Sequence, residues 1–204
     1  MKKDSKGTKI FTLSNAFLVV ALIFVAALLF VPEFKGNVIS GLMKIGLFQA
    51  NIQEIHIATP LSQQQPGDGI ILRDKNGQHF SLDSLKGHIV FINLWATWCP
   101  PCKAELPSIN KLKKHFENNK TVIFLTIDAD GAPQKAAGYL AQQSFDLPVY
   151  ALEGRIPQML SPDAIPYTIV LDKGGFIVYR HSGAADYSRS KFIDFMERLA
   201  DNNH

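Results

Sequence analysis

Cysteine is scarce in this chain: its 204 residues include only Cys99 and Cys102. A structural zinc site needs about four ligands, and this pair supplies two of them. The histidines show no His-x₃₋₅-His spacing, so zinc binding is disfavoured. Covalent c-type haem would require a histidine directly after the second cysteine, where Lys103 stands instead. A disulfide between these two residues would close too short a loop to stabilise the fold much, so the pair is a candidate for chemistry.

An excess of charge is also missing from most of the chain. The formal net charge is +3, and residues 1–9 account for all of it with four lysines against one aspartate. The rest of the chain holds 17 basic and 17 acidic residues, so no basic patch indicates a nucleic-acid partner. The N-terminal lysines bear instead on orientation in a membrane.

A long apolar run follows these lysines. Residues 16–31 carry no polar side chain. As a helix they would span about 24 Å, and residues 11–15 extend this length to about 31 Å. Since a bilayer core is about 30 Å thick, we expect a transmembrane signal anchor at 11–31 and a cytoplasmic N-terminus at 1–10. A cleaved signal peptide is the alternative, although no Ala-x-Ala site follows the run.

Two further segments complete the expected organisation. Residues 32–68 should form a juxtamembrane segment and a linker, because Ser, Gln, Pro and Gly gather toward its end. Residues 69–204 should form one folded domain. In chain order we expect strands at 70–72 and 80–82 joined as a hairpin, a strand at 89–95, a helix from 101 to about 118, a strand at 121–127, a helix at 133–143, strands at 147–152, 167–171 and 176–181, and a final helix around 192–199. This order predicts an α/β fold with a mixed central sheet flanked by helices.

The two cysteines lie on the turn between the strand at 89–95 and the helix that follows it. Free N–H groups and the positive end of the dipole at a helix N-terminus favour a thiolate over a thiol. Pro100 and Pro101 suit this position, because the N–H that proline lacks has no intrahelical partner there. Two thiols at this place can close a small disulfide or open to a nucleophilic pair, so the sequence predicts dithiol chemistry.

The segment N-L-W-A-T-W-C-P-P-C-K-A-E-L-P, from Asn93 to Pro107, resembles the active-site segment of the TlpA/ResA branch of the thioredoxin superfamily. The likeness runs from about Gly69 to the C-terminus and includes Ile165-Pro166 before a later strand. It implies a thioredoxin fold with an N-terminal β-hairpin extension. It also implies a membrane-anchored thiol–disulfide oxidoreductase that works outside the cytoplasm.

By the same resemblance, Cys99 is the exposed thiol, and we assign it as the nucleophile. Its thiolate would attack a client disulfide, and Cys102 would resolve the mixed disulfide. Pro166 resembles the cis-proline that lies against the cysteines in this superfamily. Ile165 and Pro166 would then offer a backbone edge to a substrate peptide, and Trp98 would shield the site and contact the client.

Glu105 has two interpretations. Most glutamates on helix surfaces are merely solvated, but ResA-like proteins resemble this chain in carrying a carboxylate three residues past the second cysteine. Asn93 stands where ordinary thioredoxins have a buried acid, and an amide cannot titrate. Because Cys102 must give up a proton, Glu105 is the best candidate for a base.

The direction of electron flow follows from the two prolines between the cysteines. Pro100 and Pro101 offer neither an N–H nor a charge, so a thiolate should be weakly stabilised and the disulfide comparatively stable. We therefore expect a reductase of client disulfides. The resemblance suggests apocytochrome c in cytochrome c maturation as a client, and a membrane thiol donor of the DsbD/CcdA type. The expected location is the inner (cytoplasmic) membrane, single-pass, with the catalytic domain facing the periplasm or outside.

Two other functions stay open at this point. A Cu(I) metallochaperone could use the same thiolate pair, and Met159 or His181 close to the pair would favour it. A peroxiredoxin-like peroxidase would place threonine three residues before its cysteine, where Ala96 stands. We expect no cofactor and no resident metal. Asp128 and Asp130 should solvate and cap the end of a strand rather than form a metal pair.

Overall fold

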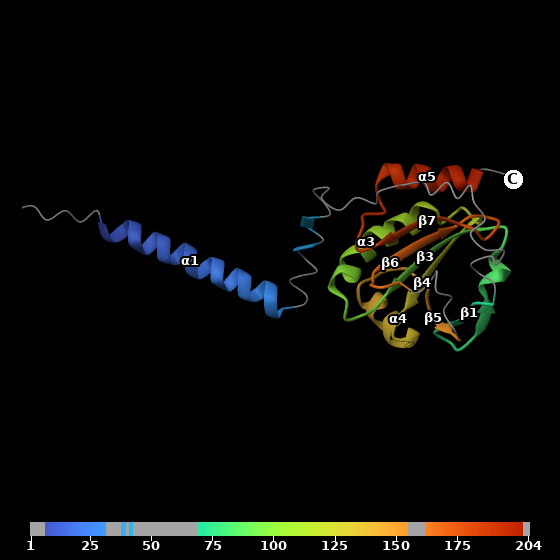
Figure 1. The fold of residues 1–204 in the computed structure, drawn as a ribbon, viewed down its shortest axis with the longest axis horizontal. Helices are drawn as coiled ribbons and strands as arrows, with labels where there is room; N and C mark the ends of the chain where they lie inside the picture. Colours follow the sequence, from blue (N-terminus) through green and yellow to red (C-terminus); the bar gives the residue numbers. More distant parts are fainter. Residues whose placement is uncertain (1–6, 32–37, 40, 43–68, 155–161, 202–204) are drawn as a thin grey trace, which may run out of the picture.

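The computed structural model describes residues 7–31, 38–39, 41–42, 69–154 and 162–201. Most of these residues belong to a domain built on one seven-stranded sheet with the order β2-β1-β5-β4-β3-β6-β7 (Figure 1). In chain order the elements are α1 (Gly7–Phe30), β1 (Ile71–Asp74), β2 (His79–Ser81), the 3₁₀ helix η1 (Leu82–Leu85), β3 (Ile89–Trp95), α3 (Pro100–His115), β4 (Val122–Asp128), α4 (Pro133–Gln142), β5 (Val149–Glu153), β6 (Tyr167–Leu171), β7 (Ile177–Ser182) and α5 (Ser190–Asp201).

β3 is the centre of the sheet. All seven of its residues are buried, as expected of an apolar strand covered on both faces. It pairs parallel with β4 on one side and antiparallel with β6 on the other. The mixed sheet expected from the sequence is confirmed, and the carboxyl end of β3 leads directly into the turn with the cysteines.

The N-terminal hairpin joins this sheet through β5. β1 pairs antiparallel with β2 and, on its other side, antiparallel with β5. In the turn between β1 and β2, the Asp74 carboxylate accepts the backbone N–H groups of Asn76 and Gln78, at 2.8 Å each. Gly77 has a φ of +84°, a conformation that favours glycine. The expected hairpin extension is therefore present, and it is a continuation of the main sheet.

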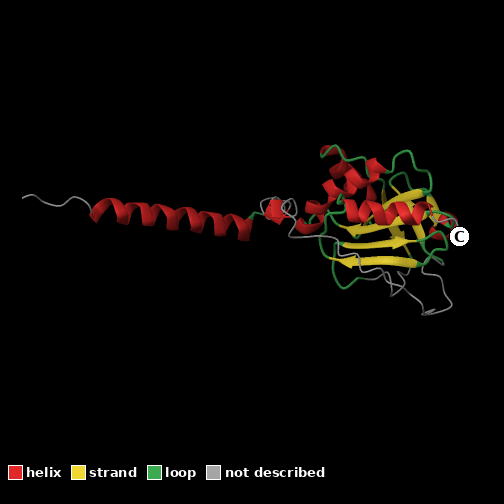
Figure 2. Cartoon of the chain, turned by 90° about the horizontal axis from the view of Figure 1, so that it is seen from above, coloured by secondary structure: helices red, strands yellow, loops and turns green. Residues whose placement is uncertain are grey.

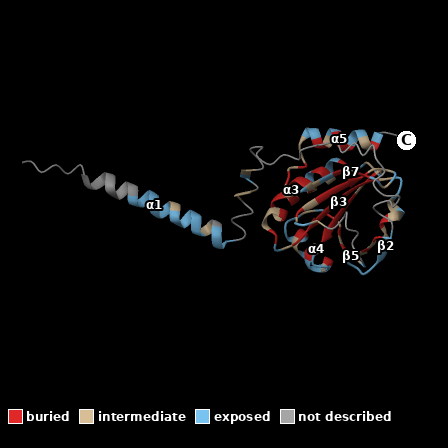
Figure 3. Cartoon of the chain, viewed as in Figure 1, coloured by how far each residue is buried: buried red, intermediate tan, exposed pale blue. Residues whose placement is uncertain are grey.

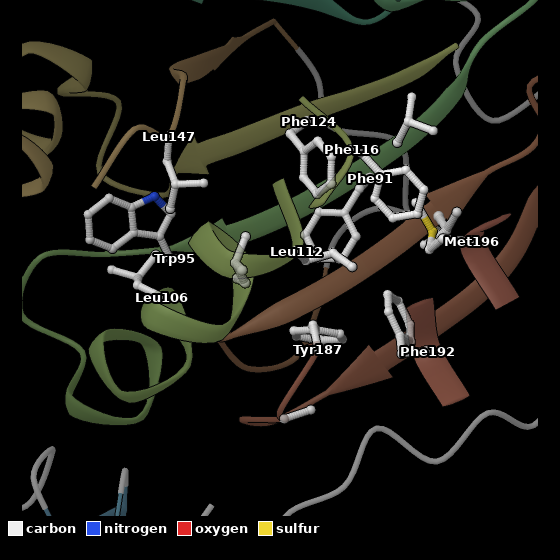
Figure 4. Close-up of a cluster of buried hydrophobic side chains, with 14 of the residues drawn as sticks. Phe91, Trp95, Leu106, Leu112, Phe116, Phe124, Leu147, Tyr187, Phe192 and Met196 are labelled. Atoms are coloured by element: carbon white, nitrogen blue, oxygen red, sulfur yellow. The ribbon is translucent and has the colours of Figure 1, made fainter. Parts of the chain in front are cut away.

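Side chains of the sheet alternate between two hydrophobic clusters. Phe91 and Trp95 face the cluster that receives apolar residues of α3, α4 and α5, and Figure 2 shows the helices gathered on one side of the strands. Val90 and Leu94 face the second cluster, which includes Leu72 of the hairpin. The labelled residues of the first cluster in Figure 4 are Phe91, Trp95, Leu106, Leu112, Phe116, Phe124, Leu147, Tyr187, Phe192 and Met196. Figure 3 shows that the strands are largely buried and that the helices of the domain are exposed on their outer sides.

α1 covers most of the predicted transmembrane segment. Its apolar side chains are widely exposed, from Phe17 at 75% to Phe30 at 81%. Among the described residues, no helix combines the length and the apolar character needed to cross a membrane. The predicted span at 11–31 therefore stays a prediction. Most of the predicted linker at 32–68 lies outside the described residues.

Candidate active site

Cys99 and Cys102 form a disulfide, with their Cα atoms 5.3 Å apart. Cys99 is the N-cap residue of α3 and Cys102 lies in its first turn. The expected exposure of Cys99 is not found in this disulfide form, because Cys99 is buried with 3% of its surface exposed and Cys102 is fully buried. Cys99 is still the more accessible of the two. The backbone dictates this placement, because β3 ends at Trp95 and the chain turns into α3 at Pro100.

The N-terminus of α3 gives the Cys99 sulfur one backbone hydrogen bond. The N–H of Cys102 donates to Cys99 Sγ at 3.3 Å. Pro100 and Pro101 occupy the first two positions of the helix and have no N–H to offer. The first turn contains no acidic residue to offset the positive end of the helix dipole, and basic residues in the last turn complement its negative end. The site therefore favours a thiolate, although with fewer donors than a helix start without proline.

The cis-proline loop lies against the same sulfur. The Ile165–Pro166 peptide bond is cis, the form that the resemblance implies. The carbonyl oxygen of Ile165 is 3.9 Å from Cys99 Sγ. Because a disulfide sulfur carries no hydrogen, this is a contact and not a hydrogen bond. Tyr167 follows as the first residue of β6 and pairs with Leu94 near the end of β3. The sheet thus brings together two segments that are 66 residues apart in the chain.

Glu105 is fully buried, which excludes the interpretation as a solvated surface glutamate. Its Oε1 accepts the side-chain amide of Asn93 at 2.7 Å, and its Oε2 accepts the backbone N–H of Ala185 at 3.2 Å. Burial raises the pKa of Glu105 to about 8, and these two hydrogen bonds oppose the rise. A carboxyl with that pKa can both accept and release a proton near neutral pH.

A buried polar group of side chains surrounds Glu105. Asn93 also donates to Thr168 Oγ1 at 3.0 Å. Burial raises the pKa of Tyr187 well above its usual value, and the charge of Glu105 adds to this effect. Burial likewise raises the pKa of Tyr179, with a smaller contribution from Glu105. Thr168 and the two tyrosines were missed by the sequence analysis, because they come from β6, β7 and the segment before α5, with no local motif to connect them to the cysteines.

Trp98 is exposed directly beside the nearly buried Cys99, with 62% of its surface accessible. Its indole Nε1 donates to both carboxylate oxygens of Asp130, each at 3.0 Å. Asp128 caps the end of β4 as expected, by accepting the N–H of Ala132 at 2.7 Å. The bond between Asp130 and Trp98 was not predicted. Trp95, by contrast, is fully buried in the core.

Five of the six predicted site residues lie together. Cys102 is bonded to Cys99, Trp98 precedes Cys99 in the chain, and the Ile165–Pro166 loop contacts the Cys99 sulfur. The sixth, Glu105, lies on the same helix as Cys102. Within the described part of the chain, no group of three or more His, Cys, Asp or Glu side chains could hold a metal ion. His181 stacks on Tyr179, and Met159 lies outside the described residues.

Comparisons with known proteins agree with this geometry. The model of the Redoxin family matches residues 52–192. The thiol-disulfide oxidoreductase ResA of Bacillus cereus is 32% identical over 130 residues, which cover 63% of this chain and 73% of that protein. A crystal structure of a candidate thiol-disulfide oxidoreductase from Bacteroides vulgatus is 27% identical, with a TM-score of 0.53 and coverage of 63% and 90% of the two chains. A thiol:disulfide interchange protein from Chlorobium tepidum shares the fold at 23% identity, with a TM-score of 0.52 and coverage of 63% and 90%.

Proposed function

We propose that this chain, which belongs to the Redoxin family and is a thiol-disulfide oxidoreductase, reduces disulfides in client proteins outside the cytoplasm. The observation that carries this proposal is the position of Cys99. Its sulfur caps the N-terminus of α3 and lies 3.9 Å from the carbonyl oxygen that precedes the cis-proline. A peptide that approaches this sulfur therefore meets a thiolate-favouring helix end and the backbone of the cis-proline loop together.

In the first step, the Cys99 thiolate attacks one sulfur of the client disulfide. A new sulfur–sulfur bond joins Cys99 to the client, and the client's own disulfide breaks. The second client sulfur leaves as a thiolate and takes a proton. The N–H of Cys102, which donates to Cys99 Sγ, would stabilise the attacking thiolate.

In the second step, Cys102 resolves the mixed disulfide. Its thiol loses a proton, for which we propose the Glu105 carboxylate as the acceptor, and its sulfur attacks Cys99 Sγ. The bond between Cys99 and the client breaks, the released client sulfur takes a proton so that the client leaves as a dithiol, and Cys99 and Cys102 are left as the disulfide. Two electrons have then passed from the protein to the client. Because Cys102 and Glu105 are both fully buried, water is a poor competitor for this proton.

The two prolines support reduction as the direction of the reaction. Among the described residues, the N–H of Cys102 is the one that donates to Cys99 Sγ, since the prolines at the first two helical positions have none. A thiolate with few donors is less stable, so the dithiol gives up its electrons more readily. The protein should thus have a reduction potential nearer to that of thioredoxin, about −270 mV, than to that of the oxidant DsbA, about −120 mV.

A reductase outside the cytoplasm has to be supplied with electrons. We propose a membrane thiol donor of the DsbD/CcdA type and, as one client class, apocytochrome c in cytochrome c maturation. Exposed apolar side chains along α1, together with the lysines before them, support attachment to the inner membrane with the catalytic domain facing the periplasm or outside.

Attachment and orientation can be tested in cells. The full chain should stay in the membrane fraction after an alkaline wash, and a reporter fused after His204 should be active only outside the cytoplasm. A shortened soluble product would contradict the anchor and indicate a cleaved signal peptide.

The reductase activity can be tested with the full chain purified in detergent. We expect the reduced protein to reduce insulin with transfer of one disulfide equivalent per molecule, and Cys99→Ser to abolish the reaction. Equilibration with glutathione or dithiothreitol gives the reduction potential. A potential near that of DsbA, or full activity of Cys99→Ser, would contradict the proposal.

A further inference from the structure

The exposed ring of Trp98 is held by a charged acceptor. Its single indole N–H lies 3.0 Å from each oxygen of Asp130, a carboxylate that is itself exposed. Hydrogen bonds to an ionised acceptor are stronger than neutral ones, so this bond restricts an indole that has little packing around it. The ring next to Cys99 is therefore presented in one orientation rather than left free to rotate.

The loop that carries Asp130 is fixed at both ends. The N–H of Ala129 donates to the carbonyl of Trp95 at 2.9 Å, and Asp128 accepts the N–H of Ala132. Between them, Gly131 has a φ of +70°, a conformation that L side chains rarely adopt. The position of the Asp130 carboxylate thus depends on how this short loop is held.

The N-terminal hairpin supplies a third attachment. Arg73 of β1 donates from its Nη2 to the carbonyl oxygen of Gly131 at 3.2 Å. The guanidinium is oriented by Glu153 of β5, whose Oε1 accepts from Arg73 Nε at 2.7 Å. The other carboxylate oxygen of Glu153 lies 2.8 Å from His79 Nδ1 on β2. A continuous set of contacts therefore links the hairpin to the loop, and the loop to Trp98.

We propose that Arg73 and Asp130 are positioning residues that fix Trp98 as a contact surface for the peptide around a client disulfide. This inference rests on the proposed reduction of protein disulfides. A peptide docked on Cys99 would lie between the cis-proline edge and the indole, whereas a small disulfide can reach the sulfur without covering either. The fixed position of Trp98 therefore favours the reduction of disulfides in polypeptides over that of small-molecule disulfides. It also gives the hairpin a role in recognising the client.

The test compares two substrates of the reduced full chain, insulin and hydroxyethyl disulfide, in single-turnover reactions. We expect Asp130→Ala to lower the ratio of the insulin rate to the hydroxyethyl disulfide rate by about threefold to tenfold, the range of one aromatic contact. Arg73→Gln should lower the ratio in the same direction by about twofold to threefold, because it acts through the loop. Asp130→Asn keeps an acceptor oxygen and should recover part of the preference.

Collisional quenching of fluorescence reports on the ring itself. The chain has two tryptophans, and Trp95 is fully buried, so iodide reaches only Trp98. Quenching should change in Asp130→Ala and in Arg73→Gln. The matched control is Asp163→Ala, which removes an exposed carboxylate two residues before Ile165 and should change neither quenching nor the ratio.

The double variant Arg73→Gln/Asp130→Ala should lower the ratio no further than Asp130→Ala alone, because both residues act through Trp98. An unchanged ratio in Asp130→Ala, equal losses on both substrates, or fully additive effects of the two variants would overturn the inference. Failure of the unaltered protein to reduce either substrate would instead contradict the proposed function.

Discussion

Two carboxylates of the active-site region lie in opposite environments. Glu105 lies on α3, fully buried, and accepts hydrogen bonds from Asn93 and from the backbone of Ala185. Asp130 lies on an exposed loop and accepts the indole N–H of Trp98. Burial raises the pKa of Glu105 to about 8, so its ionisation is poised near neutral pH. Asp130 stays accessible to water and serves as a fixed acceptor.

This difference shows how one kind of side chain can take two roles around one disulfide. A buried carboxyl whose pKa lies close to neutral pH is suited to move a proton for Cys102. An exposed carboxylate is suited to hold a neighbouring group in place. In the proposed mechanism, the surroundings of each carboxyl group determine whether it moves a proton or positions a neighbouring side chain.

The largest effect is expected when Glu105 can no longer ionise. Glu105→Gln should slow resolution of the mixed disulfide by about 10² to 10⁴, the usual contribution of a general base. Single-turnover release of client from a preformed mixed disulfide measures this rate. The control is Glu117→Gln, which changes an exposed glutamate just after the same helix and should leave the rate unaltered. Equal rates in both variants would remove Glu105 from the mechanism.

The second prediction concerns stability against pH. A carboxyl whose pKa is higher in the folded state than in the unfolded state binds its proton more tightly when folded. The stability that this group contributes is fully present below its unfolded pKa of 4.5 and is lost as pH rises through its folded pKa of about 8. We expect the oxidised protein to lose several kcal/mol of unfolding free energy between pH 5 and pH 9 from this group, and Glu105→Gln to lose much less. Denaturant unfolding at both pH values checks this, and parallel losses would refute it.

A smaller effect should follow from the amide that holds Glu105. Because the hydrogen bond from Asn93 lowers the pKa of Glu105, Asn93→Ala should raise that pKa further. The midpoint of the pH profile for resolution should move upward by about one pH unit. Asn119→Ala, which removes an asparagine from a turn beside Thr121, is the control and should leave the midpoint in place. A downward shift in Asn93→Ala would show that the amide does not stabilise the carboxylate.

Local sequence patterns predicted most of the fold. The strands at 89–95 and 167–171 have the bounds that were expected, because runs of β-branched and aromatic residues with turn signals on both sides specify a buried strand. The helix after the cysteines ends at His115, before the predicted residue 118. Phe116 continues the apolar spacing and is buried, yet it is the C-cap, so the pattern of burial extends past the helical backbone.

The candidate site was only partly predictable. The cysteines and the helix start follow from adjacent residues. The buried Glu105 accepts hydrogen bonds from Asn93, twelve residues before it, and from Ala185, eighty residues after it. The bond between Trp98 and Asp130 likewise spans 32 residues. Hydrogen bonds between residues so far apart in the sequence are determined by how the whole sheet packs, so no local spacing predicts them.

The central claim is that Cys99 attacks the client and Cys102 resolves the mixed disulfide. The direct measurement incubates the reduced Cys102→Ser full chain with insulin and maps the covalent adduct by mass spectrometry. We expect a stable mixed disulfide on Cys99, and almost no adduct in the matched Cys99→Ser variant. An adduct that accumulates on Cys102 in Cys99→Ser, with none on Cys99 in Cys102→Ser, would contradict the account.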